Sequence, residues 1–395
     1  MDPLLRFRSE FPILSRTNYL VSNSLGAMPR TVPARLAEYG DAWAADGVRA
    51  WANGWWEMPV AVGDVIAPLL GAGAGEVVMA PNVSLAQAMV ISAIDFSSPR
   101  DGLVTTALDF PSVRYVYDGL GRRLGARIVE VPSEDGIGVD TEALLAAIDE
   151  RTRLVAISHV LFRSAFVIDI DAVCRRAREA GALVMLDAFH SVGVMPVDVG
   201  ATGAHFLTGG VLKWLCGGPG GCFLYVSPEI RDELAPGVTG WQSHARPFSF
   251  ELGHEPAAGP FRWLTGTPSI PALYAATEGP RLVSEAGIGP IREKNRRQTA
   301  RLIELADARG YPVQAPRDPD LRGGAVALAV PNAEAVAQAL LARDIIVDYR
   351  PDAGIRIAPH FYTSDDEIEE SVHAIEEILE KGSWREFVEE SRTVT

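Results

Sequence analysis

Short apolar runs alternate with helical patterns between about Trp43 and Ala275. This alternation is typical of a parallel sheet whose strands are connected by helices. The apolar runs are continuous and do not alternate with polar residues, which indicates strands that are covered on both faces. Strands are predicted at 76–80, 103–108, 154–158 and 183–187, and helices at 85–94, 113–124 and 171–180. The pattern predicts an α/β fold with a mainly parallel sheet covered by helices.

The pattern becomes more helical from about Ile270, and residues 276–309 predict a long helical connector. Beyond the connector, strands are predicted at 324–330, 345–349 and 354–357, and helices at 333–342 and 364–381. These elements indicate a smaller α+β domain. The first forty residues are expected to be irregular, because prolines mark several turns there. We therefore divide the chain into an N-terminal segment (1–42), a large domain (43–275), and a connector helix with a small C-terminal domain (276–395).

Charge and composition argue against several classes of protein. The chain of 395 residues carries 36 basic and 51 acidic residues, which gives a formal net charge of −15. Nucleic-acid binding needs clustered Lys and Arg, so nucleic acid is not an expected partner. The sequence shows no secretory signal and no apolar run of the length that spans a bilayer. Its three cysteines form neither a disulfide framework nor a zinc spacing. We therefore expect a cytoplasmic protein without a metal site or a membrane segment.

Several predicted strands end in polar or aromatic residues, namely Asp109–Ser112, Ser158–His159 and Asp187–Ser191. An Asp at a strand end is usually a helix cap, and a lone His is usually structural. Ligands of parallel sheets, however, bind beyond the carboxyl ends of the strands, so the shared location of these residues favours a binding site. Asn82–Ser84 precedes a predicted helix, where it could form either a phosphate cradle or a simple N-cap.

Lys213 is the most distinctive candidate for covalent chemistry. The chain has only three lysines, and Lys294 and Lys381 lie beside Glu on polar helical stretches, where we expect them to be solvated. Val, Leu and Trp surround Lys213, and a glycine-rich run follows it. Apolar surroundings lower the pKa of a lysine, as Schiff-base chemistry requires; the alternative is a structural lysine. Arg356 lies among apolar residues on a short predicted strand, where it either binds a carboxylate or pairs with a surface acid.

A set of motifs spread over nearly the whole chain points to one enzyme family. The motifs are Asn23–Gly26, Gly54–Pro59, Phe110–Ser112, Asp187–Ser191, Gly217–Gly220, Gly240–Trp241, Gly266–Thr267 and Gly354–Arg356. Lys213 also follows Asp187 by 26 positions (213 − 187). In these features the chain resembles the fold-type I enzymes that depend on pyridoxal 5′-phosphate (PLP), of the class V aminotransferase group, and within that group the kynureninases. The resemblance implies the fold-type I PLP-dependent transferase fold, with PLP bound by the large domain.

The resemblance also implies a role for each matching residue. Lys213 would form a Schiff base with PLP and Asp187 would pair with the protonated pyridine nitrogen, which makes these two the catalytic residues. Phe110 would stack on the ring, and His190 would lie beside it. The residues that would bind the phosphate are Val83, Ser84, Trp241 and Thr267, and those that would bind the substrate are Ser24, Trp55, His244 and Arg356. In this family some of these contacts come from the neighbouring subunit, which implies a homodimer with its active site at the subunit interface.

The reaction implied is hydrolytic cleavage of the Cβ–Cγ bond of L-kynurenine or a related aromatic β-acyl alanine, a step of tryptophan degradation. Three departures thin the polar network but leave the PLP site intact. Leu212 replaces a tyrosine of the kynureninases, Val113 replaces an aspartate, and 158–164 is more apolar than in the family. A class V aminotransferase, epimerase or carbon–sulfur lyase is the alternative, and a catalytically silent member of the fold is a more remote one. Cysteine desulfurases usually have His directly before the lysine, where this chain has Leu212.

Overall fold

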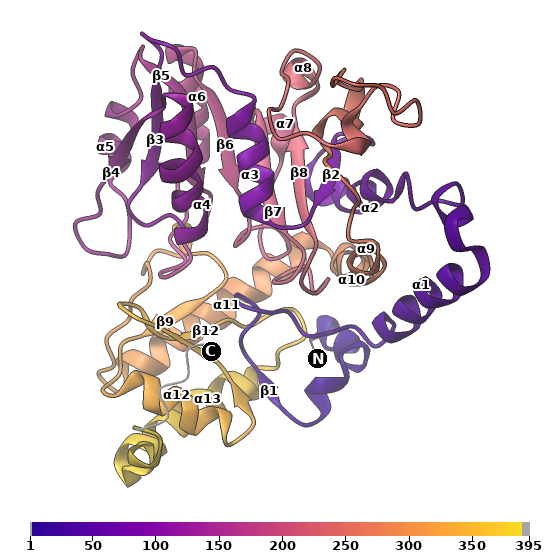
Figure 1. Cartoon of the computed structure of the whole chain (residues 1–395). Coiled ribbons are helices and arrows are strands. Elements are labelled where there is room, and N and C mark those ends of the chain that lie inside the picture. The colour runs from indigo at the N-terminus through magenta and orange to yellow at the C-terminus, as the bar shows by residue number, and fades with distance from the viewer. Residues whose placement is uncertain (1, 389–395) are drawn as a thin grey trace.

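The computed structural model describes residues 2–388 and has two parts, seen one above the other in Figure 1. The upper part is built on a seven-stranded sheet with the order β2-β8-β7-β6-β5-β3-β4. Its strands are β2 (Val77–Ala80), β3 (Gly102–Thr106), β4 (Arg127–Val131), β5 (Thr152–Ser158), β6 (Leu183–Asp187), β7 (Phe206–Gly210) and β8 (Cys222–Val226). Neighbouring strands are parallel except at β8, which is antiparallel to both β7 and β2. The expected mainly parallel sheet is confirmed.

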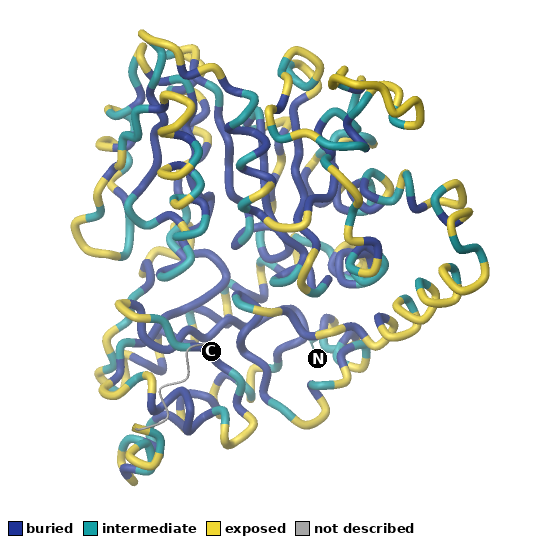
Figure 2. Tube along the Cα trace, in the orientation of Figure 1, coloured by how far each residue is buried: buried dark blue, intermediate teal, exposed yellow. Residues whose placement is uncertain are grey.

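Alternate residues of the central strands enter two different hydrophobic cores. On β3, Leu103 belongs to the core that includes α3 (Val83–Ser92), whereas Val104 belongs to the core that includes α6 (Ile170–Ala180). Figure 2 shows the strands buried along most of their length. Because both faces are covered, nearly every strand position can be apolar, which explains the continuous runs in the sequence.

The N-terminal segment contributes a helix that is mostly exposed. The helices before the small domain are α1 (Val32–Asp46), α2 (Met58–Ile66), α3, α4 (Pro111–Val116), α5 (Thr141–Ala146), α6, α7 (Val199–Thr202), α8 (Pro228–Arg231) and α9 (Ile270–Ala275). Helix α1 packs on α9, but Val32 is the only buried residue among its 15. Figure 2 shows most of α1 in the colours of exposed and half-buried residues. This helix therefore has a large surface that the single chain leaves uncovered.

The lower part contains a three-stranded antiparallel sheet with the order β11-β12-β9. Its elements are α10 (Glu278–Ala286), α11 (Ile288–Asp307), β9 (Val326–Leu328), α12 (Ala333–Leu341), β10 (Ile345–Ile346), β11 (Asp348–Arg350), β12 (Gly354–Ile357) and α13 (Asp365–Lys381). The N-terminal strand β1 (Asn18–Tyr19) pairs in parallel with β10. The residues that follow β1 are therefore held beside the small domain.

Three local predictions are wrong. The first forty residues are not irregular, because they form 3₁₀ helices at Pro3–Glu10 and Pro12–Ser15 and the start of α1. Proline is the first residue of the two 3₁₀ helices and the second residue of α1, where the first helical turn needs no N–H from it. The predicted connector is two helices, which separate at Gly287 with a φ of +82°. The predicted strand at 345–349 is divided between β10 and β11, which lie in different sheets.

Candidate active site

A cavity of about 370 Å³ lies between the carboxyl ends of the parallel strands and the small domain. Eight of the twelve predicted site residues line it: Ser24, Val83, Ser84, Phe110, Asp187, His190, Lys213 and Arg356. Asp187 ends β6, and Lys213 lies in the loop after β7. Arg356 comes from β12, so both parts of the chain contribute to the cavity. The structure thus brings together residues that are far apart in the sequence.

The amine of Lys213 is buried beside His190 and the ring of Phe189. Its Nζ lies 2.6 Å from Nε2 of His190 and 4.6 Å from the ring centre of Phe189. Burial, and then the charge of Arg356, lower the pKa of Lys213 below its ordinary value. Burial and the neighbouring Lys213 also lower the pKa of His190 well below its ordinary value. The neutral imidazole can accept a hydrogen bond from the amine, and the amine is easily obtained in its nucleophilic form.

Asp187 is a buried carboxylate at the end of β6. Its Oδ1 accepts a hydrogen bond from the backbone N–H of Phe189 at 2.9 Å. Burial raises the pKa of Asp187, while this hydrogen bond and the charge of Lys213 act in the opposite direction. A buried carboxylate is stabilised by a nearby positive charge, such as a protonated ring nitrogen.

The first turn of α3 contributes Val83 and Ser84 to the cavity. The side chain of Asn82 accepts a hydrogen bond from the N–H of Leu85 at 2.9 Å, so the N-cap interpretation is confirmed. The cap does not exclude an anion site. The N–H groups of a first helical turn point beyond the helix, and the helix dipole favours negative charge there. This turn therefore suits a phosphate group.

Arg356 is held by a buried acid and not by a surface acid. Its Nε donates to Oδ1 of Asp348 at 2.8 Å, and its Nη2 donates to Oδ2 of the same carboxylate. Its Nη1 donates to the carbonyl oxygen of Phe162 at 2.6 Å. Asp348 is fully buried, and β12 is the central strand of its sheet. The interpretation of Arg356 as an edge-strand residue paired to a surface acid is therefore wrong.

Four predicted site residues lie outside this cavity. The indole N–H of Trp55 donates to the hydroxyl of Tyr274 at 3.2 Å. Trp241 and His244 line a separate hollow of about 260 Å³, and Thr267 lines a small hollow near the turn before α3. The roles of these four residues in binding PLP or substrate stay predictions.

Several residues of the cavity were missed by the sequence reasoning. Asn23 is 1% exposed and lines the cavity, and neither polar atom of its side chain has a hydrogen-bond partner within residues 2–388. Phe162 packs edge-on against Phe110, with ring centres 5.2 Å apart. Arg350 lines the cavity from β11. The signal for Asn23 was present, because it begins the Asn23–Gly26 motif.

Two polar residues have structural roles. Asp109, at a strand end, accepts hydrogen bonds from the backbone N–H groups of Thr106 and Ser158, so it connects β3 and β5. Lys294 is buried and not solvated as expected. Its Nζ donates to the carbonyl oxygen of Phe361 at 2.8 Å and lies 2.7 Å from the carboxylate of Asp2. The polar neighbours of Lys294 along the helix did not reveal that its own side chain points inward.

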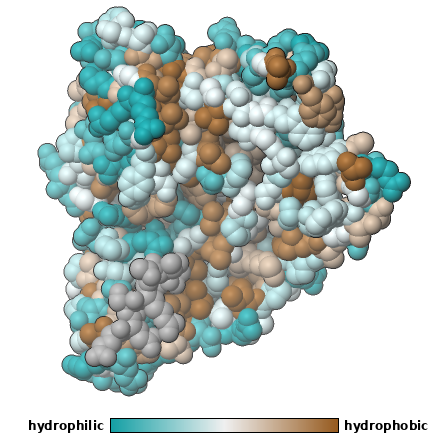
Figure 3. Space-filling model, viewed as in Figure 1, coloured by the Kyte–Doolittle hydropathy of each residue, from teal (hydrophilic) through white to brown (hydrophobic). Residues whose placement is uncertain are grey.

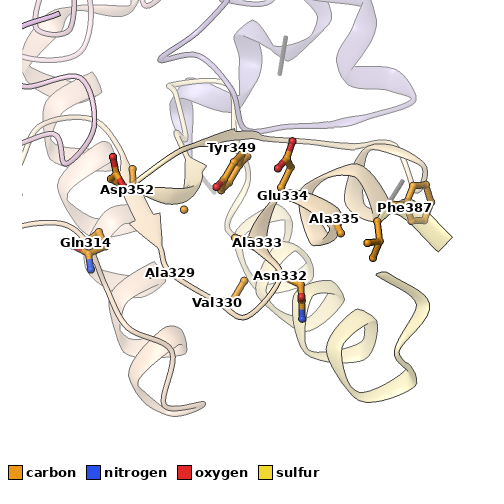
Figure 4. Close-up of a pocket in the computed structure, with 13 residues that line it drawn as sticks. Gln314, Ala329, Val330, Asn332, Ala333, Glu334, Ala335, Tyr349, Asp352 and Phe387 are labelled. Atoms are coloured by element: carbon orange, nitrogen blue, oxygen red, sulfur yellow. The ribbon is translucent and has the colours of Figure 1, made fainter. Parts of the chain in front are cut away.

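A larger hollow of about 580 Å³ lies in the small domain, on the side of β11 where Tyr349 lies (Figure 4). None of the predicted site residues lines it. Because successive residues of a strand point to opposite faces, the hollow beside Tyr349 and the cavity lined by Arg350 lie on opposite sides of β11.

The described residues include no cluster of three His, Cys, Asp or Glu side chains that could hold a metal ion. Within the same residues, no helix combines the length and hydrophobicity that a membrane span requires.

Comparison with known proteins identifies the family. The family model described as aminotransferase class-V matches residues 18–358. The chain belongs to the class V aminotransferases. Similar relatives include the kynureninase of Pseudomonas fluorescens, which is 32% identical over 400 residues, covering 97% of this chain and 94% of the relative. The kynureninase of Burkholderia pseudomallei (strain 1106a) is 31% identical over 401 residues, with the same coverage. The resemblance of this class V chain to kynureninases is confirmed.

Solved structures show the same fold. A cysteine desulfurase from Thermococcus onnurineus NA1 has a TM-score of 0.85 at 23% identity, covering 95% of this chain and 98% of that chain. The cysteine desulfurase CsdA from Escherichia coli has a TM-score of 0.83 at 18% identity, covering 96% and 99%. A C-DES structure with glycine covalently linked to its PLP cofactor has a TM-score of 0.83 at 19% identity, covering 93% and 98%. The expected fold-type I architecture is confirmed.

The cofactor expected of a class V aminotransferase, PLP, is confirmed by the family, and the cavity fits it. A lysine with a lowered pKa, a buried carboxylate and a helix N-terminus line one space beside the aromatic ring of Phe110. These groups match the aldehyde, the ring nitrogen, the phosphate and the ring face of PLP in turn.

Proposed function

We propose that this class V aminotransferase is a PLP-dependent hydrolase of the kynureninase type, which cleaves the Cβ–Cγ bond of L-kynurenine or a related aromatic β-acyl alanine. The observation that carries the proposal is the identity of 31–32% with kynureninases over 97% of the chain. The reaction adds one water molecule to L-kynurenine and yields anthranilate and L-alanine. PLP supplies the electron sink that such a bond cleavage requires.

The residues of the cavity divide this work. Lys213 would bond PLP covalently, and its free amine would accept the α-proton of the substrate. Asp187 binds the protonated ring nitrogen, and His190 accepts a hydrogen bond from the lysine amine. Val83 and Ser84, which line the cavity at the start of α3, would bind the phosphate. The lowered pKa of Lys213 supports this assignment, because a neutral amine is required both for bonding and for proton transfer.

Aromatic side chains favour a flat substrate side chain. Phe110, Phe162 and Phe189 line the cavity together, and the rings of the first two meet at an interplanar angle of 85°. Arg356 would bind the α-carboxylate of the substrate, and Ser24 contributes a hydroxyl to the lining of the same cavity. An aromatic amino acid satisfies both the apolar and the cationic lining.

A homodimer accounts for the predicted residues outside the cavity. Trp55, Trp241, His244 and Thr267 would complete the site of the second subunit. The uncovered surface of α1 supports this proposal, as do the exposed side chains of Trp43, Phe248, Phe250 and Leu252. Figure 3 shows brown hydrophobic residues on the right of the molecule, where Figure 1 places α1. We expect sedimentation to give twice the chain mass, and a monomer would contradict the proposal. A cytoplasmic location stays a prediction.

The decisive experiment combines absorption and product analysis. The purified protein loaded with PLP should show a visible band that borohydride abolishes, and L-kynurenine should release fluorescent anthranilate. Lys213→Ala should lose both signals, whereas Lys381→Ala should retain them because Lys381 is exposed and paired with Glu377. A band without anthranilate would reject kynurenine as the substrate and leave the PLP enzyme. If Lys213→Ala keeps the visible band, or if the wild-type protein shows no band at all, the assignment of Lys213 is rejected.

Carbon–sulfur cleavage is the second candidate, because the solved structures of the same fold include cysteine desulfurases and the cystine C–S lyase C-DES. A desulfurase uses a mobile cysteine nucleophile. All three cysteines are buried and free here, and burial raises the pKa of Cys216 and Cys222 to about 12. These thiols are poor nucleophiles, which favours the hydrolase. Sulfide release from L-cysteine or L-cystine, without anthranilate from L-kynurenine, would reverse this preference.

A further inference from the structure

Three charged side chains meet where the small domain lines the cavity. Strands β11 and β12 are antiparallel, with Asp348 opposite Arg356. Because alternate residues of a strand share a face, Arg350 lies on the same face as Asp348. The Nη2 of Arg350 lies 3.2 Å from Oδ2 of Asp348, the carboxylate that also accepts two hydrogen bonds from Arg356. The sheet register thus builds a cluster of two guanidinium groups around one carboxylate.

Within residues 2–388, the cluster carries one positive charge more than its single carboxylate neutralises. Arg350 and Arg356 both line the cavity, and Asp348 is fully buried between them. Burial lowers the pKa of Arg350, but a guanidinium remains protonated in proteins. Two positive charges and one negative charge leave a surplus of one. A partly buried surplus cation is stabilised by an anion, and an α-amino acid brings one carboxylate.

The donors of Arg356 are already largely used by the protein. Its Nε and Nη2 bind Asp348, and its Nη1 binds the carbonyl oxygen of Phe162. A guanidinium has five N–H groups, so two remain on the terminal nitrogens. The contact with Asp348 fixes the plane of the guanidinium, and Arg356 lines the cavity, so a ligand bound there can use the remaining donors. Asp348 therefore controls how Arg356 presents itself to a ligand.

Arg350 has donors of its own at the same cavity. Its Nη1 donates to the carbonyl oxygen of Tyr349 at 2.7 Å, and its Nη2 lies 3.5 Å from Oγ of Ser24, which is the limit of a hydrogen bond. A ligand oxygen at this position would replace that long contact with a short, charge-assisted one. Ser24, Arg350 and Arg356 line one continuous space.

We propose that Arg350 is a second ligand of the substrate α-carboxylate and that Asp348 is the positioning residue that orients Arg356 toward it. The proposal rests on the proposed function only in requiring an α-amino acid as the substrate. Its consequence for specificity is that the site demands a free α-carboxylate. Amines and α-carboxamides, which cannot neutralise the surplus charge, are excluded as substrates.

The test is a double-mutant cycle between protein and ligand. L-Phenylalanine and L-phenylalaninamide are titrated into the PLP-loaded enzyme, and the dissociation constants are read from the visible absorption band. Arg350→Gln should weaken L-phenylalanine binding about 10-fold or more and change L-phenylalaninamide binding less than about 2-fold. Arg343→Gln is the matched control, because it removes a half-buried ion pair with Glu377 in the same domain and should change neither. Equal effects of Arg350→Gln on both ligands, or no effect, would overturn the proposal.

Asp348→Asn separates positioning from simple charge neutralisation. Removing the carboxylate raises the local charge from one to two, which by electrostatics alone would tighten the binding of an anion. Loss of the orientation of Arg356 would instead weaken it, and we expect weakening. Arg350→Lys keeps the positive charge but loses the planar guanidinium that can donate two parallel hydrogen bonds. Its affinity for L-phenylalanine should therefore lie between those of the wild type and Arg350→Gln. Because Asp348 is buried, the variant must match the wild type in circular dichroism and PLP loading; if it does not, the decision falls to the two Arg350 variants.

Failure of this proposal is distinguishable from failure of the proposed reaction. If L-kynurenine is cleaved, Arg350→Gln should raise KM by the same factor with little change in kcat, because the carboxylate contact exists in both ground and transition states. Cleavage of L-kynurenine with an unchanged KM would overturn only the role of Arg350. Absence of cleavage, together with selective loss of L-phenylalanine binding in Arg350→Gln, would overturn only the choice of substrate.

Discussion

The carboxylate of Asp109 connects the two strands that end beside the cavity. Its Oδ1 accepts a hydrogen bond from the N–H of Ser158 at 2.6 Å, and its Oδ2 accepts from the N–H of Thr106 and the hydroxyl of Thr105, both at 2.8 Å. The side chain is 2% exposed. Asp109→Ala leaves three buried donors without their acceptor, and water has little access to replace it. We therefore expect this variant to be strongly destabilised.

The magnitude follows from the number and type of bonds at Asp109. Each hydrogen bond to a charged group contributes about 1.5–3 kcal/mol, so three independent bonds would sum to roughly 5–9 kcal/mol. The three donors share one carboxylate and relax together, and bonds that share a partner are not additive. We expect a loss of about 4 kcal/mol in the free energy of unfolding. Asp109→Asn keeps one acceptor oxygen but turns an amide N–H₂ toward the other donors, so it should lose roughly 2 kcal/mol.

Urea unfolding followed by circular dichroism measures these losses directly. The control is Asp140→Ala, which removes the exposed N-cap of α5, where Oδ1 accepts from the N–H of Ala143 at 2.7 Å. An N-cap contributes about 1 kcal/mol. If Asp109→Ala costs no more than Asp140→Ala, the buried bonds do not hold the strand ends as argued. Phe110 follows Asp109, so the destabilised variant should also load PLP less completely.

The other predictions concern the lysines and one glycine. Because burial lowers the pKa of Lys213, the amount of PLP trapped by borohydride should reach half of its maximum below pH 10.5, and a midpoint at or above pH 10.5 contradicts the assignment. The apoprotein should also become more stable as the pH rises toward 10.5, because in that range the lysine of the unfolded chain binds more protons than the lysine of the folded chain. Gly26→Ala should weaken PLP binding about 10-fold in an absorption titration, whereas Gly289→Ala, which meets open space, should leave it unchanged. Lys294→Met should lower the free energy of unfolding by about 2–3 kcal/mol, because it leaves a buried carbonyl oxygen and a carboxylate without their partner. The control Lys381→Met should change the free energy of unfolding by less than about 0.5 kcal/mol, and equal losses in the two variants would contradict a structural role for Lys294.

Part of the central sheet could be predicted, because a strand that is buried on both faces forms a short continuous run of apolar residues. Strands β3, β5 and β6 are buried along almost all of their length and were predicted within two residues at each end. Three strands of the sheet were missed, namely β4, β7 and β8. In the edge strand β4, four of the five residues, including Glu130, are half-buried or exposed and interrupt the apolar run, whereas β7 and β8 are buried throughout and were still not predicted. The common edge of the predicted strands then located most of the cavity. Asp187 and Lys213 needed no more than that edge and the family motifs.

The small-domain half of the site could not be predicted in the same way. Strand β11 has three residues, which is too short for any periodic pattern to stand out. The pairing of Asp348 with Arg356 depends on the register of two strands, which a single sequence does not specify. Lys294 presents the same difficulty, because its partner Asp2 lies 292 positions away in the sequence (294 − 2). Contacts of this kind become visible only when the tertiary arrangement is known.

The backbone on either side of Leu212 is held by the N-terminal segment. The carbonyl oxygen of Leu212 accepts a hydrogen bond from the N–H of Gly26 at 2.8 Å, and a Cβ on Gly26 would lie 2.2 Å from the carbonyl oxygen of Lys213. Gly26 of the Asn23–Gly26 motif therefore contacts the main chain of the Lys213 loop at the carbonyl groups of both Leu212 and Lys213. The position of the amine is set by this contact and by His190, neither of which involves the side chain at 212. A leucine at 212 therefore leaves the amine of Lys213 in place.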